Sequence, residues 1–419
     1  MAAPFEVALT TDESGQLWNI CMWDISTGTT LTTYKGGMSR SRTLDLIGQD
    51  YLISASKKEP VLQIWSSSKT DPFHLKMITP GKVTCLAVCP DGMYCVAGIE
   101  DKLNIWQIST GHLLAAYSFH YQSIACIKFT DDGSYFISAG EDGLVLVWDL
   151  SQVLSLNSEA PQPCHIWSHH TLQVTDIHVG LGGIRARVAT CSLDQTCKLY
   201  ELATGHLLVS IVMENALTVV TMDAAEYFIF LGAINGNIYQ INLFSFIKSG
   251  ENHLEKENEE NMFKGHCKQV TCLSVSLDGQ ILLSGSDDET ARLWSIQSKQ
   301  CIRIFDHKGP VTNALLIRAP SNYAKSRLPV STFQRQLYEL NEEMEENQTQ
   351  RRKTVVQIKK HEPSEVIKEN EIYFPECRDF RMRSDIQSKE EVIKENKKLS
   401  EMNRQLYLYS IDTVLNSIK

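Results

Sequence analysis

The 419-residue sequence lacks the patterns of membrane and secreted proteins. No uninterrupted apolar stretch approaches the roughly eighteen residues that a membrane helix needs. The start, MAAPFEVALTTDESG, has no basic segment followed by an apolar run, as a secretory signal would. Disulfides are not expected either, because cysteines such as Cys85, Cys126, Cys191 and Cys272 fall within alternating, strand-like patterns as small buried hydrophobic residues. We therefore expect a soluble intracellular protein without a membrane partner.

Catalytic and nucleotide-binding signatures are also missing from the sequence. There is no GxxxxGK[ST] phosphate loop, no HExxH or GxSxG motif, and no CxxC pair with zinc spacing. We therefore expect no enzyme activity, no cofactor and no metal. The net charge of −10 argues against nucleic-acid binding over a broad basic surface, although it leaves room for a local basic patch.

Residues 265–296, GHCKQVTCLSVSLDGQILLSGSDDETARLWSI, form one supersecondary unit. VTCLSVS and ILLSGS alternate like two half-buried strands, Asp278-Gly279 suits the turn between them, and TARLWS is the third strand. This unit resembles a WD repeat. In that family four side chains hydrogen-bond in series beneath the turn, and the matching residues here are His266, Ser284, Asp288 and Trp294.

The third strand of this unit recurs seven times along the chain. The aligned positions repeat every 41 or 42 residues, apart from two steps of 52 and 53 residues that each contain an insertion. These aligned positions are Trp23, Trp65, Trp106, Trp148, Tyr200, Ile241 and Trp294. Six residues before each of them lies the family's turn position, which is aspartate in three copies, at Asp142, Asp194 and Asp288.

The polar residues of these units also recur. His120 and Asp142 are 22 residues apart, as are His266 and Asp288, and a serine lies between the members of each pair, at Ser138 and Ser284. Trp148 completes the first set as Trp294 completes the second. A catalytic or metal site would occur once, whereas a hydrogen-bond network that stabilises a blade should recur with the blade. We therefore interpret both sets as structural networks.

The two ends of the repeat array are each incomplete. Residues 5–11, 19–24 and 30–34 match second, third and fourth strands without a first strand, and residues 311–317 match a first strand with nothing after it. A blade shared between the two ends would leave no free sheet edge. The sequence thus predicts an all-β fold: a seven-bladed WD-repeat β-propeller over residues 1–318, closed by a shared blade and followed by a C-terminal helical extension.

The two insertions lie between third and fourth strands. Residues 151–163 contain two prolines and small polar residues, so we expect an exposed loop there. Residues 244–261, FSFIKSGENHLEKENEEN, are rich in glutamate over 251–260. This run is typical of a solvated loop, and a docking loop for a basic partner is the alternative.

The composition changes after the propeller. Residues 319–385 are predicted to be a linker and a helical or irregular segment, in which Phe333, Leu337, Leu340 and Met344 have helical spacing. Residues 386–419 are predicted to be a coiled-coil-like helix. Its candidate self-association seam is Val392, Leu399, Met402, Leu406 and Tyr409. A helix for a partner's groove and a helix packed on the propeller are the alternatives.

Three stretches resemble one family. They are SHHTLQVTDIHVGLGGIRARVATCSLDQTCKLYELATG, FKGHCKQVTCLSVSLDGQILLSGSDDETARLWSIQSKQCIR with the following KGPVTNALLI, and KENKKLSEMNRQLY. They are similar to the WD repeat-containing protein 18 family, the propeller subunit of the rixosome. The resemblance implies a non-catalytic scaffold that supports large-subunit pre-ribosomal RNA processing and maturation of the pre-60S particle. Tyr200 and Ile241 depart from the family's tryptophan positions.

The same resemblance implies partners and a location. The partners are a helical-repeat scaffold rich in proline, glutamate and leucine, a second helical-repeat subunit, and an associated endonuclease and polynucleotide kinase. The location is the nucleus and nucleolus, with room for a cytoplasmic pool. Two other functions stay open at this point: a propeller substrate receptor of a ubiquitin ligase, and a direct RNA-binding propeller.

Overall fold

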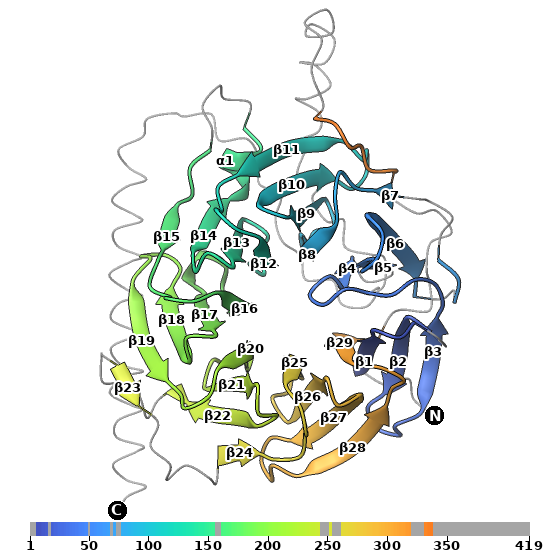
Figure 1. The fold of residues 1–419 in the computed structure, drawn as a ribbon, viewed down its shortest axis with the longest axis vertical. Coiled ribbons are helices and arrows are strands. Elements are labelled where there is room, and N and C mark those ends of the chain that lie inside the picture. The colour runs from blue at the N-terminus through green and yellow to red at the C-terminus, as the bar shows by residue number, and fades with distance from the viewer. Residues whose placement is uncertain are drawn as a thin grey trace, which may run out of the picture. The chain divides into compact units, whose positions relative to one another are not determined.

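The computed structural model of the chain describes residues 6–15, 18–48, 51–67, 70–72, 77–155, 161–243, 251–253 (backbone only), 261–319 and 331–337. Contacts divide the chain into two units, 1–341 and 342–419, and the second lies outside the described residues. The described part of the first unit is a ring of seven antiparallel sheets (Figure 1), which confirms the predicted seven-bladed propeller. The predicted helical extension and its seam lie outside the described residues.

Each blade has four antiparallel strands, numbered from the ring axis outward. Blade 1 contains β4 (Asp45–Ile47), β5 (Tyr51–Ala55), β6 (Val61–Ser66) and β7 (Met77–Ile78), and blade 2 contains β8 (Val83–Val88), β9 (Tyr94–Ile99), β10 (Lys102–Gln107) and β11 (Leu113–Ser118). Blade 3 contains β12 (Ile124–Phe129), β13 (Tyr135–Gly140), β14 (Val145–Asp149) and β15 (His165–Trp167). Blade 4 contains β16 (Val174–Val179), β17 (Arg187–Ser192), β18 (Thr196–Glu201) and β19 (Leu207–Val212).

The remaining three blades follow the same order. Blade 5 contains β20 (Leu217–Met222), β21 (Phe228–Ala233), β22 (Ile238–Asn242) and β24 (Met262–Phe263). Blade 6 contains β25 (Val270–Val275), β26 (Ile281–Ser286), β27 (Thr290–Ser295) and β28 (Cys301–Asp306), and blade 7 contains β29 (Val311–Arg318), β1 (Glu6–Asp12), β2 (Ile20–Asp24) and β3 (Thr30–Tyr34).

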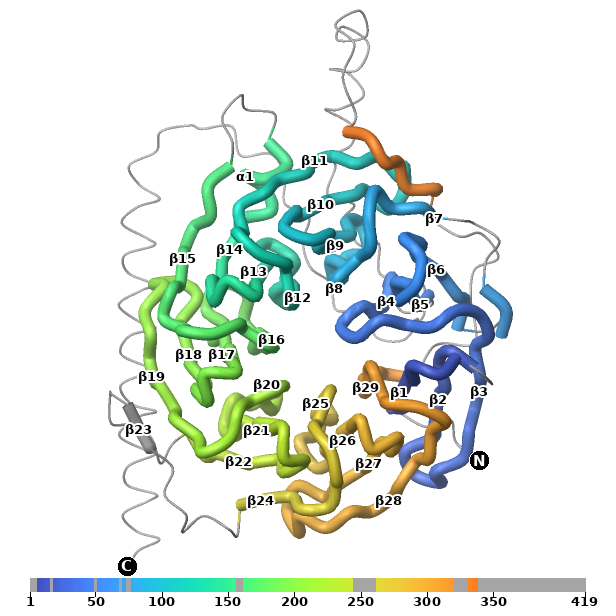
Figure 2. Tube along the Cα trace, viewed as in Figure 1, coloured from blue at the N-terminus to red at the C-terminus, as the bar shows by residue number. Residues whose placement is uncertain are grey.

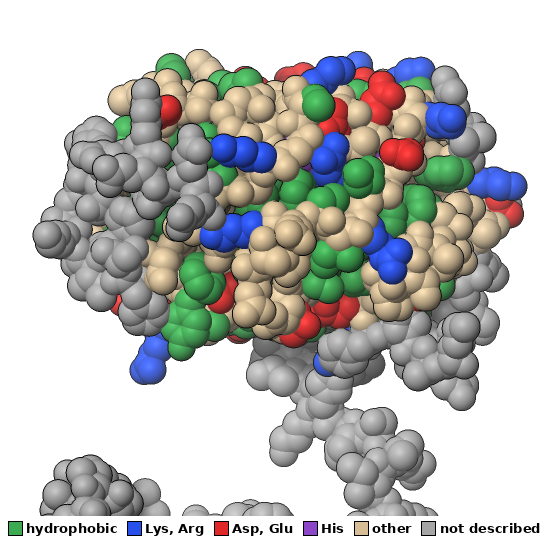
Figure 3. All heavy atoms as spheres, turned by 90° about the horizontal axis from the view of Figure 1, so that it is seen from below, with side chains coloured by type: hydrophobic (Ala, Val, Ile, Leu, Met, Phe, Trp, Pro, Cys, Tyr) green, Lys and Arg blue, Asp and Glu red, His purple; other side chains and the backbone are tan. Residues whose placement is uncertain are grey.

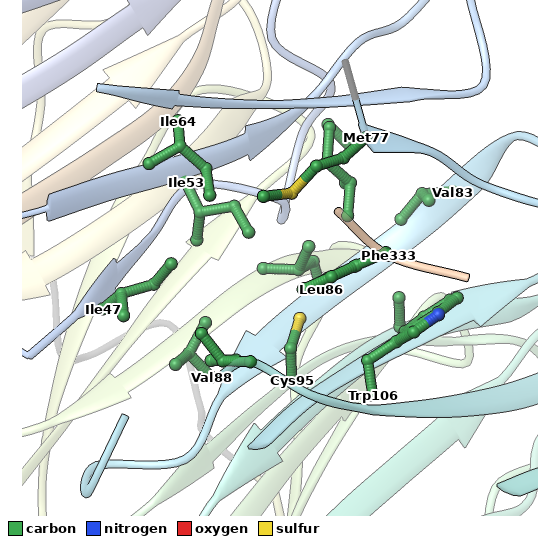
Figure 4. Close-up of a cluster of buried hydrophobic side chains, with 14 of the residues drawn as sticks. Ile47, Ile53, Ile64, Met77, Val83, Leu86, Val88, Cys95, Trp106 and Phe333 are labelled. Carbon is green, nitrogen blue, oxygen red and sulfur yellow. The ribbon is translucent and has the colours of Figure 1, made fainter. Parts of the chain in front are cut away.

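The hydrophobic core lies largely between neighbouring blades. The middle strands of a blade are buried on both faces; in β5 all five residues are buried. Figure 4 shows one such layer, in which Ile53 and Ile64 of blade 1 approach Leu86 and Cys95 of blade 2. Because burying one large aliphatic side chain stabilises a fold by roughly 1.5–3 kcal/mol, these layers hold adjacent blades together.

Threonine hydroxyls also join the innermost strands of adjacent blades. Thr175 Oγ1 donates to the carbonyl of Leu217 over 3.0 Å, which links blade 4 to blade 5. Thr218 Oγ1 donates over 2.6 Å to Val270 O, and Thr271 Oγ1 over 2.6 Å to Val311 O. These links satisfy buried polar groups and fix the spacing of blades 4 to 7 around the axis.

Blade 7 combines the two ends of the propeller sequence. β29 pairs antiparallel with β1, with Leu315 opposite Leu9, so the sheet order is β29-β1-β2-β3. Figure 2 traces the orange β29 beside the blue N-terminal strands. A buried hydrogen bond of 2.6 Å between the hydroxyls of Thr11 and Thr312 adds to this pairing. The ring is closed by strand pairing rather than by side-chain contacts alone.

The insertions carry short elements that their composition did not indicate. The first begins as helix α1 (Leu150–Val153), whose Leu150 and Val153 are buried. The second contains β23 (Glu251–His253), which adds a parallel fifth strand to the outer edge of β19 in blade 4. A 3-10 helix (Gly183–Arg185) lies in the loop between β16 and β17. No helix among the described residues is long and apolar enough to cross a membrane.

The helical spacing that begins at Phe333 was misleading. Residues 331–337 are not helical in the structure, and Phe333 is buried among residues of blades 1 and 2. The amide of Gln334 donates to Gly111 O over 2.7 Å, so the turn between β10 and β11 holds this segment. Contact with blade 2 therefore overrides the local pattern.

Candidate functional site

The first predicted network lies in blade 3. His120 precedes β12, Ser138 lies on β13, Asp142 lies in the following turn and Trp148 lies on β14. The Trp148 indole donates to Ser138 Oγ over 3.1 Å, and Ser138 Oγ lies 2.9 Å from His120 Nε2. His120 Nδ1 lies 3.1 Å from Asp142 Oδ2. The structure brings all four side chains together in one series.

The second predicted network has the same geometry in blade 6. The Trp294 indole donates to Ser284 Oγ over 2.8 Å, and Ser284 Oγ lies 2.7 Å from His266 Nε2. His266 Nδ1 lies 2.8 Å from Asp288 Oδ2. Asp288 also accepts the backbone amide of Cys267 over 3.1 Å. The carboxylate therefore ties the loop before the first strand to the turn before the third.

Each bond of the series uses one proton when the histidine is neutral. The indole N–H donates to serine, the serine O–H donates to His266 Nε2, and the Nδ1–H donates to Asp288. A doubly protonated imidazole would direct a second N–H at Ser284, whose own proton would then lose its acceptor. The neutral tautomer with a proton on Nδ1 is thus the one that satisfies every buried group.

The pKa shifts in blade 6 agree with this assignment. Burial lowers the pKa of His266 and outweighs the opposing hydrogen bond to Asp288, so the ring is kept neutral. For Asp288, burial alone would raise the pKa. The hydrogen bonds from Thr290 and His266 outweigh burial and lower the pKa of Asp288 to about 2. Asp142 follows the same rule, because His120 and two backbone amides overcome the effect of burial and its pKa is lowered.

A third network in blade 4 was missed by the sequence reasoning, except for its turn residue Asp194. His170 Nε2 lies 2.8 Å from Thr190 Oγ1, and His170 Nδ1 lies 3.0 Å from Asp194 Oδ2. Threonine takes the place of serine, and the histidine precedes the aspartate by 24 residues rather than 22. Tyr200 occupies the tryptophan position and stacks on Trp167, with ring centroids 4.0 Å apart. A search that treated serine and threonine as equivalent would have found this set.

The other tryptophans are bonded differently. In blade 7 the Trp23 indole donates to Thr10 Oγ1 over 2.7 Å. In blade 1 the Trp65 indole donates to the backbone carbonyl of Lys35 over 2.8 Å. In blade 2 the Trp106 indole donates to the carbonyl of Gln334, outside the repeats. Ile241 of blade 5 has no donor to offer, so only packing holds this position.

Charged side chains near the ring axis form a further set. Arg42 precedes blade 1 and reaches Asp176 of blade 4, with Nε 3.4 Å from Oδ1. Its Nη2 donates to Thr218 O of blade 5 over 3.0 Å. Asp176 Oδ2 in turn accepts the amide of Val220 over 3.2 Å. Burial raises the pKa of Asp176 even though Arg42 opposes it. These groups cross-link blades that are not neighbours.

The polar residues thus serve the fold rather than a reaction. Every histidine of the three full networks is held between a hydroxyl and a carboxylate of its own blade. Within the part of the chain that the structure describes, no group of three or more His, Cys, Asp or Glu side chains is placed to hold a metal ion.

Exposed apolar side chains lie on both faces of the ring. In these four-stranded meanders, the loops between first and second strands open onto one face, which includes the exposed Met93, Leu181, Tyr227 and Leu277. The loops that precede first strands open onto the opposite face, where Tyr121 is 86% exposed and Leu172 is 54% exposed. Both faces therefore offer contacts for other macromolecules.

The outer side of the ring carries apolar residues as well. Figure 3 views the side where β24 and β28 lie and shows hydrophobic side chains gathered near its middle, among charged ones. Ile302 and Ile304 of β28 are both about half exposed. A groove of about 420 Å³ begins beside them and is lined by Ile281, Leu293 and carboxylates that include Asp24.

Comparison with known proteins places these features in a family. The model "WD domain, G-beta repeat" matches residues 111–149 and 258–295, which include parts of blades 2 and 3 and of blade 6. The chain is 46% identical over 343 residues to WD repeat-containing protein 18 of Danio rerio, covering 80% of each chain. The match to the Homo sapiens protein of that name is also 46% identical over 343 residues, covering 80% of this chain and 79% of the relative.

A more distant relative carries a functional name. Pre-rRNA-processing protein pro-1 of Caenorhabditis elegans is 28% identical over 312 residues, covering 72% of this chain and 59% of that protein. Propellers of this repeat type, together with these relatives, point to a non-catalytic protein-interaction scaffold rather than an enzyme.

Proposed function

Because the chain belongs to the WD repeat-containing protein 18 family, we propose that it acts in pre-ribosomal RNA processing as a non-catalytic scaffold subunit of the rixosome. In this role it supports processing of large-subunit pre-ribosomal RNA and maturation of the pre-60S particle. The observation that carries the proposal is the 46% identity to that family over 80% of the chain. The name of the Caenorhabditis relative, a pre-rRNA-processing protein, supports the same process.

The geometry of the ring suits a scaffold. Strand pairing between β29 and β1 closes it, and three internal networks and several threonine links stiffen it. A rigid ring orders little of its own chain on binding, so less interaction free energy is lost to that ordering. Exposed apolar residues on both faces, such as Tyr121 and Tyr227, allow more than one partner to bind at once.

The partners that we propose follow from the family. They are a helical-repeat scaffold rich in proline, glutamate and leucine, a second helical-repeat subunit, an associated endonuclease and polynucleotide kinase, and the pre-60S particle. We also propose self-association through the seam Val392, Leu399, Met402, Leu406 and Tyr409, and a nuclear and nucleolar location.

Affinity purification of the tagged full-length protein followed by mass spectrometry tests this proposal. We expect helical-repeat proteins and large-subunit assembly factors to co-purify. Recovery of ubiquitin-ligase adaptors in their place would favour the substrate-receptor function. RNA that crosslinks directly to the propeller, without protein partners, would favour the RNA-binding one.

Two double variants make the purification informative about the faces of the ring. Tyr121→Asp with Leu172→Asp changes one face, and Tyr227→Asp with Leu277→Asp changes the other with the same added charge. All four residues are exposed, so both proteins should fold. We expect each face variant to lose a different subset of partners; if neither loses any, the exposed residues on the two faces are not the scaffold's contact surfaces.

A further inference from the structure

Residues 331–337 lie against blade 2 as a docked peptide. Figure 2 shows this orange segment beside β11 and β7, and Leu337 pairs with Leu113 of β11 in a parallel bridge. The amide of Ser331 donates to Ile108 O over 3.1 Å, and its hydroxyl donates to Ser109 O over 2.7 Å. The segment is thus held through its backbone at both ends, as an extended ligand is held by an edge strand.

Phe333 is the side chain that fills a pocket. It is only 6% exposed and stacks on Trp106, with ring centroids 5.4 Å apart and planes inclined by 11°. Figure 4 shows the ring between Met77 of blade 1 and Trp106 of blade 2. An aromatic side chain that is buried in a preformed apolar pocket supplies most of the affinity in interfaces of this kind.

Two features of blade 2 differ from blade 3 and create this site. On β9, Ala97 occupies the position that Ser138 has on β13, so the Trp106 indole has no hydroxyl acceptor within its blade. It donates over 2.8 Å to the carbonyl of Gln334 in the docked segment. The second feature is Gly111, where a Cβ atom would lie 2.1 Å from Thr332 O. The groove therefore requires glycine at its wall.

We propose that blade 2 carries a peptide-binding site for an extended segment with a phenylalanine anchor, and that residues 331–337 of the chain itself are its ligand. The site would recognise the backbone of Ser331 and Gln334 and the ring of Phe333. Docking would make the following residues leave the ring beside β11 rather than beside β29 in blade 7. Release of the segment would change that point of departure.

A labelled synthetic peptide of residues 329–339 tests the proposal. The protein is the full chain with residues 331–337 replaced by a Gly-Ser sequence of equal length, which empties the groove. We expect the peptide to bind this variant in fluorescence anisotropy, and to bind the wild type at least about tenfold more weakly because the groove is already filled. A peptide with Phe333→Ala should also bind at least about tenfold more weakly, since the anchor is lost.

Glycine substitutions provide a matched control in the Gly-Ser variant. Gly111→Ala should abolish peptide binding by closing the groove. Gly28→Ala lies in the corresponding turn of blade 7, with φ of +76° against +75° at Gly111, and meets only the side chain of Arg303. It imposes similar backbone strain and should leave peptide binding unchanged.

The outcomes are decisive in either direction. Absence of binding to the folded Gly-Ser variant at millimolar peptide, or binding that Gly111→Ala leaves unaffected, overturns the proposal. If the Gly-Ser variant does not fold, full-length Phe333→Ala takes its place, because it loses only the anchor. Binding of the peptide to that protein supports the proposal, and its absence overturns it.

Discussion

Removing the Asp288 carboxylate should destabilise the propeller without affecting any chemical step. Its two oxygens accept from His266 Nδ1 at 2.8 Å, Cys267 N at 3.1 Å, Thr290 N at 3.0 Å and Thr290 Oγ1 at 2.6 Å. In Asp288→Ala the exposed amide of Cys267 can turn to water. The His266 side chain is fully buried, so its Nδ1–H loses its partner. An unsatisfied buried donor costs about 1–3 kcal/mol.

Equilibrium urea unfolding, followed by tryptophan fluorescence, measures this loss. With a slope of about 3 kcal/mol per molar urea, the midpoint should fall by about 0.3–1 M. Asp306→Ala is the matched control, because it removes the same charge from an exposed position on β28 of the same blade. It should change stability by less than about 0.5 kcal/mol. Equal midpoints for Asp288→Ala and the wild type would refute the network as a source of stability.

Three further predictions concern closure, pH and assembly. A chain ending at Thr312 lacks most of β29 and leaves the inner edge of β1 unpaired, so it should melt well below a chain ending at Leu337; equal melting temperatures would contradict closure through blade 7. Burial, with Lys128 nearby, lowers the pKa of His178 to about 4, so the unfolded chain binds this proton first and stability should decline as pH falls from about 6.5 to 4. His178→Gln should make that decline in the urea midpoint smaller, and an unchanged decline would count against it. Leu399→Asp with Leu406→Asp should convert a dimer to a monomer in light scattering, whereas a monomeric wild type would exclude self-pairing.

The ring could be predicted from the sequence because each blade repeats the same local requirements. An indole at Trp148 or Trp294 needs a hydroxyl two residues further along the neighbouring strand, and the turn needs an aspartate to accept its amides. These demands fix spacings within about thirty residues of one another, so they are visible without a structure. The networks of blades 3 and 6 were found in this way.

Features that depend on distant contacts could not be predicted. His170 was missed because Thr190 and an altered spacing hide the same geometry. The pairing of β23 joins an insertion of blade 5 to the edge of blade 4, which composition cannot indicate. Phe333 and Leu337 have helical spacing, yet the backbone of their segment bonds to the turn at Gly111. In these two segments tertiary contacts outweigh the local pattern.

Precursor analysis after depletion tests the proposed function most directly. Cells are depleted of the protein, and spacer-containing precursors of the large ribosomal RNA are quantified by northern blotting. We expect the precursor to accumulate, and full-length wild-type protein to restore its level. Asp288→Ala should restore it as well at a temperature where the variant is folded, because the carboxylate supports the blade rather than a reaction. Unchanged precursor levels after complete depletion would contradict a role in large-subunit ribosome assembly.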